Sequence, residues 1–391
     1  MNSSALRGHR FLMRLALALV HAFAWIFLFE YFYLLSGSIE RALGGVVILY
    51  GFAQFITMIV TPVAAAHLSH GTRRSLLFGT LVAACAFTVL GATFSGYFKE
   101  PALWGVVLFA TLLGLYRALY WVPYTLANAD ATTNPHVHTY GEVLLALMPL
   151  FAGLTLGARE NAPTLLLFGA AAMLVLSALI GYGAPETRER FSWPYVYTFK
   201  QLLRSKNRGL VLHALLEGMQ GAALFLIWPI AIFLIVEWSY VTFGFIFAIT
   251  LLSILLLRRA YRWLSGMVGI NNSPIVHTVV AASGWIARLA AGTPIGIVIA
   301  DVYSYSTLPE RGTHIDPFSF EHASDRGAFL DEYTALKEIA HALGRIMLCG
   351  IVFFLATAFA LPIVFATALG IAASAAAIAV LVAHRGPAPA Y

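Results

Sequence analysis

The chain contains few charged residues for its length. Of its 391 residues, 11% are Asp, Glu, Lys or Arg, whereas 60% are hydrophobic. This composition is typical of membrane proteins, in which long apolar stretches alternate with short polar loops. A helix of about 20 residues crosses the hydrocarbon core of a bilayer. The sequence therefore has room for about a dozen such helices, and we expect no separate soluble domain.

Other absences narrow the class of function. The two cysteines, Cys85 and Cys349, both lie in apolar stretches, so we expect packed free thiols rather than a disulfide. A nucleophile elbow, a phosphate loop and an HExxH motif are missing, which argues against an enzyme. No tight ligand spacing indicates a metal site, and we expect no cofactor. The net charge of +6 does not indicate nucleic acid, because the basic residues gather between apolar stretches.

Twelve apolar stretches are long enough to be membrane spans. The short basic segment Met1–Arg10 precedes an apolar run that is too long for a signal peptide. Glycines and prolines interrupt the pattern from the eighth to the tenth stretch. The expected spans are Phe11–Leu35, Ala42–His67, Ser75–Phe94, Ala102–Val122, Tyr140–Leu156, Thr164–Gly183, Gly209–Ile235, Val241–Leu257, Pro274–Ala290, Gly292–Leu308, Glu332–Ala356 and Leu361–Ala383.

The basic residues predict the orientation of these spans. Loops on one side hold most of the arginines and lysines, whereas those on the other hold only Arg41, Lys99, Arg159 and Arg288. By the positive-inside rule, both termini are cytoplasmic, and we expect a bacterial inner-membrane protein. The stretch 186–208 is polar, with aromatic and basic residues interleaved. It predicts a linker with an interfacial helix between two halves, residues 1–185 and 209–391.

A weak internal repeat supports the two halves. The fourth span ends with Arg117, tyrosines and Pro123, and the tenth ends with Asp301, tyrosines and Pro309. Repeated halves of this kind are typical of transporters.

The chain resembles the major facilitator superfamily of transporters. Gly71, Arg73 and Arg74 stand where that family has a glycine and a basic pair, although Ser69 occupies the acidic position. Arg117 matches the span-four arginine, and Pro149 and Gly153 match a reduced span-five motif. The resemblance implies an all-α membrane protein with 12 transmembrane helices in two pseudo-symmetric six-helix bundles. It also implies a central cavity lined by spans one, four, seven and ten.

Charged residues within the expected spans are the candidates for function, because a charge in a bilayer is costly and usually faces a cavity or a partner. A salt bridge between Arg117 and Asp301 would close the inner gate in the outward-open state; alternatively, Arg117 would bind an anionic group of the substrate. Candidate proton sites are Glu217, Glu30, His213 and His21. Candidate substrate or gate residues are Arg117, Asp301, Gln220, Tyr120, Trp121, Trp228 and Tyr303. A cytoplasmic gate network would contain Arg73, Arg74, Lys337, Glu338, His341 and Arg345, together with Asp325, Arg326, Asp331 and Glu332.

The leading hypothesis is a monomeric secondary transporter that works by rocker-switch alternating access. Aromatic residues on the cavity spans favour a small, partly apolar substrate, and Glu217 favours coupling to protons. One alternative is a divalent-metal carrier that uses His21, His213, Glu217 and His341. The other is a scaffold without transport activity that binds a protein partner through the 186–208 or Pro309–Leu330 segment.

Overall fold

The computed structural model describes residues 3–96, 102–128, 138–159, 161–184, 186, 191–268, 274–306 and 331–385. The Pro309–Leu330 loop, with Asp325 and Arg326, lies outside these residues. All regular structure in the described part is helical. The main helices are α1 (Ser3–Ser36), α2 (Ile39–His67), α3 (Thr72–Phe94), α4 (Ala102–Asn128), α5 (His138–Ala158), α6 (Ala162–Gly181), α7 (Tyr195–Leu203), α8 (Arg208–Ala222), α9 (Trp228–Ile235), α10 (Tyr240–Val268), α11 (Pro274–Leu289), α12 (Pro294–Ser306), α14 (Asp331–Ala358) and α15 (Leu361–Arg385). Shorter turns are η1 (Leu68–His70), η2 (Ser205–Asn207) and η3 (Ala223–Ile227).

The expected spans are largely found as helices. In the described part of the chain, 10 helical segments are long and apolar enough to cross a membrane by length and composition. They correspond to the first eight and the last two expected spans. At the ninth and tenth positions, α11 has 16 residues and α12 has 13. At 1.5 Å per residue these are roughly 24 and 20 Å long, shorter than the hydrocarbon core of about 30 Å. Their status as spans stays a prediction.

The seventh span contains an irregular turn. α8 continues through η3, a π-helical turn, directly into α9. Pro229 follows at the start of α9 and has no N–H to donate to the carbonyl of Phe225, four residues earlier. The wider turn lies at this interruption of the hydrogen-bond ladder. Such π-turns occur often at functional sites.

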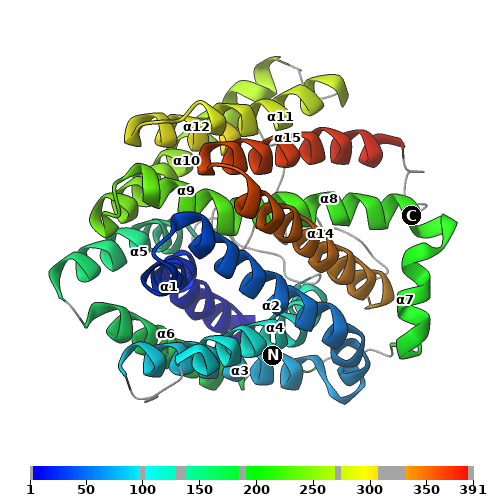
Figure 1. The fold of residues 1–391 in the computed structure, drawn as a ribbon. Helices are drawn as coiled ribbons and strands as arrows, with labels where there is room; N and C mark the ends of the chain where they lie inside the picture. The colour runs from blue at the N-terminus through cyan, green and yellow to red at the C-terminus, as the bar shows by residue number, and fades with distance from the viewer. Residues whose placement is uncertain are drawn as a thin grey trace.

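The helices from the first and second parts of the chain occupy different sides of the molecule. In Figure 1, α3, α4 and α6 lie on one side, α11, α12 and α15 lie on the other, and α2 and α14 run between them. α14 packs extensively against α2 and α8, and α5 packs extensively against α10. Glycines permit these close crossings. A methyl group on Gly153 of α5 would lie 2.5 Å from the carbonyl oxygen of Tyr240 on α10.

The predicted linker contains the expected short helix, α7. Thr198 and Gln201 are buried on one of its faces, whereas Val196 is exposed. Tyr195 Oη donates to the carbonyl oxygen of Ile59 on α2 at 3.1 Å. The N–H of Ser192, just before α7, donates to Glu332 at the start of α14 at 3.1 Å. The linker is therefore attached to both α2 and α14.

Candidate functional site

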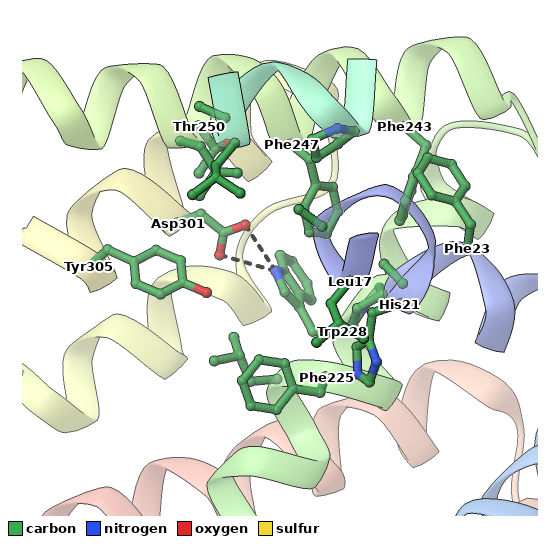
Figure 2. Close-up of a pocket in the computed structure, with 18 of the residues that line it drawn as sticks. Leu17, His21, Phe23, Phe225, Trp228, Phe243, Phe247, Thr250, Asp301 and Tyr305 are labelled. Atoms are coloured by element: carbon green, nitrogen blue, oxygen red, sulfur yellow. Dashed lines mark hydrogen bonds between the residues drawn. The ribbon is translucent and has the colours of Figure 1, made fainter. Parts of the chain in front are cut away.

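A pocket lies among helices from the two parts of the chain. It has an empty volume of about 940 Å³ and is lined by residues of α1, α5, α8–α9, α10 and α12. Figure 2 shows aromatic side chains from several of these helices around Asp301. The π-helical turn contributes Leu224 and Phe225 directly to the wall. The polar or charged lining residues are His21, Glu142, Trp228, Thr250, Asp301 and Tyr305.

Asp301 is held by two buried partners. Arg288 Nε donates to its Oδ1 at 2.7 Å, and Trp228 Nε1 lies 3.0 and 3.1 Å from its two oxygens. Asp301 and Trp228 were both expected near a cavity, and both line this pocket. The expected salt bridge between Asp301 and Arg117 is not formed in this structure. Arg288, expected in a loop, is instead buried at the end of α11 because it pairs with Asp301.

A second carboxylate, Glu142, faces the pocket from α5. Arg14 of α1 binds it in a bidentate manner: Nη1 donates to Oε1 at 3.0 Å and Nη2 donates to Oε2 at 3.3 Å. Neither residue was predicted as a site residue. Both lie near the ends of apolar stretches, next to polar sequence, where a charge indicates a solvated helix end. The packing of α5 against α1 buries the Glu142 side chain.

Several predicted substrate residues lie elsewhere. Arg117, Tyr120 and Trp121 of α4 are buried but do not line the pocket, in which α5 and α10 take the place expected for span four. The side chain of Tyr120 packs within the first part of the chain, and its hydroxyl lies 3.4 Å from His9 Nε2. Two further candidates on the pocket helices also point away from it. Gln220 bonds the carbonyl of Leu216, and Tyr303 bonds Ser283.

Aromatic side chains close the end of the pocket toward Ser36 of α1. We call this group the aromatic closure, and its members are Phe23, Phe27, Phe29, Tyr33, Phe233, Trp238, Tyr240 and Phe243. Their ring centroids lie 5.0 to 6.5 Å apart in successive pairs. Tyr240 Oη donates to Glu30, which ties α10 to α1. Phe23 and Phe243 also line the pocket, so the closure and the pocket share a wall.

A second cluster of charges lies between α8, α14 and α2. We call it the histidine network, and it comprises Gln54, His213, Glu217, Lys337, Glu338, His341 and Arg345. His213 Nδ1 and His341 Nε2 approach the same oxygen of Glu217, at 3.4 and 3.2 Å. His341 Nδ1 lies 3.7 Å from Glu338, the pairing expected from the sequence. None of these residues lines the pocket.

The histidine network also bridges the two parts of the chain. Arg345 on α14 is 1% exposed and donates to Gln54 Oε1 on α2 at 3.0 Å. Lys337 is buried on the same helix. His21 lies apart from this network, in the pocket beside Phe225. In the part of the chain that the structure describes, no group of three potential ligands could hold a metal ion.

The first turn of α3 makes an ion pair with the linker. Arg73 Nε lies 2.9 Å from Glu186, and Arg73 also donates to the carbonyls of Tyr182 and Ala184 at the end of α6. Gly71 has φ +121 and no room for a side chain beside Glu186. The acid that this motif lacks at Ser69 is thus supplied by Glu186. Arg74 is exposed.

Comparison with solved structures finds transporters of similar fold. The peptide transporter POT in complex with alafosfalin has a TM-score of 0.62 and 14% identity, covering 96% of this chain and 92% of that chain. The nucleoside transporter NupG has a TM-score of 0.59 and 12% identity, covering 97% and 99%. A bacterial homologue of the iron transporter ferroportin, in its outward-facing state, has a TM-score of 0.59 and 14% identity, covering 97% of each chain.

The chain has the major facilitator fold. No protein-family model and no curated protein matches its sequence. The similarity to these transporters, together with the apolar helices, makes it a multi-pass, all-helical membrane protein. At identities of 12 to 14%, the comparison shows the fold alone.

Proposed function

We propose that the protein is a secondary transporter of a small, partly apolar solute, driven by protons across a bacterial inner membrane. The observation that carries the proposal is the pocket of about 940 Å³ between helices of the two parts of the chain. Its lining is mostly apolar and aromatic with a few polar groups, as is typical of small-molecule sites. The π-helical turn in its wall and the aromatic closure at one end support a site that opens and closes.

The helix packing supports twelve spans in two halves of six. In the first half, α1 packs on α5 and α6, while α4 packs on α2 and α3, and α3 also packs on α6. Each of these pairs has a counterpart six spans later when α8–α9 is counted as the seventh span. The counterparts are α8 with α14, α8 with α15, α12 with α10, α12 with α11, and α11 with α15. This repeat favours alternating access by rocking one half against the other.

The contacts between the halves are the ones that must rearrange in such a cycle. Toward Ser36, the aromatic closure joins α1 to α9 and α10, and α5 crosses α10. Between α2 and α14, Arg345 binds Gln54. With both termini in the cytoplasm, the closure lies on the outer side of the membrane. Its aromatic contacts would separate when the pocket faces outward.

Glu217 is the proposed proton site. Its two nearest polar partners are the histidines His213 and His341, at 3.4 and 3.2 Å. The network reaches α2 through Arg345, so a proton gained or lost at Glu217 acts on a contact between the halves. Intramembrane carboxylates and histidines commonly form proton relays in transporters.

The test is proton flux in liposomes that contain the full-length protein and a pH-sensitive dye. Lipophilic amines, dipeptides, nucleosides and divalent metals are added outside at an imposed pH gradient. We expect one class to drive proton movement that is lost in Glu217→Gln. Glu237→Gln, the same change at an exposed residue after α9, is the matched control. Solute-driven proton flux that survives Glu217→Gln would exclude Glu217 as the proton site, and flux driven by metal alone would favour the metal carrier.

A further inference from the structure

The charges that face the pocket are of one sign. Glu142 and Asp301 line it, whereas no lysine or arginine is among its lining residues in the described chain. Arg14 and Arg288, the partners of these carboxylates, approach from outside the lining. The two carboxylates come from α5 and α12, one from each part of the chain. A bound solute therefore meets carboxylates on two walls of the pocket.

Asp301 retains capacity to accept a further hydrogen bond. A carboxylate offers about four acceptor sites on its two oxygens. Among the described residues, Oδ1 accepts from Arg288 and from Trp228, whereas Oδ2 accepts only from the indole N–H of Trp228. Arg288 lies over the rings of Trp285 and Tyr305, with its Cζ at 4.6 and 5.5 Å from their centroids. In Figure 2, Asp301 lies between Tyr305 and Trp228.

The walls around these carboxylates are aromatic. Phe225, Trp228, Phe247 and Tyr305 all line the pocket, and Phe23 and Phe243 line its closed end. Aromatic ring faces attract organic cations and also bury the apolar body of a ligand. A ligand carboxylate, by contrast, would be placed near two like charges and would find no basic lining residue.

We infer that the pocket binds an organic cation, a protonated amine with an aromatic or aliphatic body whose ammonium group donates to Asp301. The inference rests on the proposed function and names its substrate class. The ammonium group binds at Oδ2 of Asp301, and the body lies among the aromatic rings toward the π-helical turn. Glu142 on the opposite part of the chain adds a second negative charge to the same pocket.

The test uses competitors that share one body and differ in charge. The full-length protein in detergent is incubated with radiolabelled 4-phenylbutylamine, and unlabelled 4-phenylbutylamine, 4-phenylbutanol and 4-phenylbutyrate are added as competitors. We expect the amine to displace the label at about tenfold lower concentration than the alcohol, which corresponds to one cation–π or charge-assisted contact. The carboxylate should be the weakest. Equal displacement by the amine and the carboxylate, or no displaceable binding of the label, would overturn the inference.

Variants then assign the selectivity to Asp301. Asp301→Asn should lower the affinity for the amine about tenfold and leave that for the alcohol unchanged, a difference that general damage to the pocket does not produce. The double variant Arg288→Gln/Asp301→Asn removes both charges and avoids a buried arginine without its partner. Glu186→Gln, which removes a carboxylate outside the pocket, is the matched control. Unchanged amine selectivity in a folded double variant would contradict the role of Asp301.

The outcomes separate this inference from the proposed function. If a neutral or anionic solute drives flux in liposomes and no amine binds, the substrate class is wrong while the transporter stands. If amines bind in a manner that depends on Asp301 but no solute crosses the liposome membrane, the site stands and transport is wrong.

Discussion

Two regions of this protein that contain carboxylates differ in construction. In the pocket, Glu142 and Asp301 are each fixed by an arginine and face a cavity. In the histidine network, Glu217 is held by two histidines and is packed between helices, away from the pocket. Both regions lie between helices of the major facilitator fold, yet their carboxylates have partners of different chemistry.

The difference in partners indicates a difference in role. Arginine keeps its charge at any physiological pH, so the pocket carboxylates keep a constant partner. Histidine, by contrast, is the residue type most often used to gain or lose a proton in proteins, so Glu217 has partners of a kind suited to proton transfer. In the proposed function, the pocket would recognise a solute of fixed charge and the histidine network would respond to protons. Three predictions test this division.

The largest effect is expected where α8 and α14 touch. A methyl group at Gly344 would overlap the backbone of Leu215 on α8, whereas one at Gly350, farther along α14, would meet nothing within 4 Å. Gly344→Ala should therefore separate the helices that carry the histidine network and destabilise the protein by about 1–3 kcal/mol. Gly350→Ala should be neutral or stabilising by up to about 1 kcal/mol. Thermal unfolding in detergent, followed by tryptophan fluorescence, measures both, and equal midpoints would contradict the close crossing.

An intermediate effect is expected in double-mutant cycles. Glu217→Gln and His341→Gln remove two sides of one contact, so their effects on the free energy of unfolding should be non-additive by about 0.5–3 kcal/mol. Glu217→Gln and Asp301→Asn alter different regions and should add within about 0.5 kcal/mol. Thermal midpoints of the single and double variants give both values. Strong coupling between Glu217 and Asp301 would mean that the two regions form one site.

The sequence predicted the fold because its signals are long-range averages. Hydropathy marks each span over about 20 residues, and ten of the spans are found as helices of membrane length. The spacing of Glu338 and His341 places them one turn apart, and His341 Nδ1 lies 3.7 Å from Glu338. Trp228 and Asp301 were likewise expected at a cavity and line the pocket.

The rest of the site depends on packing that no local pattern encodes. A span such as α4 is apolar on most sides, so its sequence does not show which face meets the cavity; Arg117 was placed there because it is a charge within an apolar span and because of the resemblance. Glu142 and Arg288 stand at the edges of apolar stretches, where charges usually meet water. Only their partners from α1 and α12 bury them. Pro229 was the one local signal for the π-helical turn.

The smallest effect is expected at the aromatic closure, where a partly buried carboxylate, Glu30, has a tyrosine as its hydrogen-bond partner. Tyr240→Phe keeps the ring contacts with Phe27 and Phe233 but removes the hydroxyl that donates to Glu30. Because the loss leaves a partly buried carboxylate with one donor fewer, we expect a destabilisation of about 1 kcal/mol. Tyr182→Phe, the same change at a 72% exposed residue, should leave the thermal midpoint unchanged.

The hydrogen bond between Tyr240 and Glu30 joins α1 to α10, so Tyr240→Phe should also favour the conformation in which the Ser36 end is open. Faster alkylation of a cysteine introduced at Phe27 would report that opening. If the midpoint falls but alkylation stays constant, the bond contributes to stability and the closure is not a gate. If both change together, the closure, the pocket and the histidine network are three separate elements of one transport cycle.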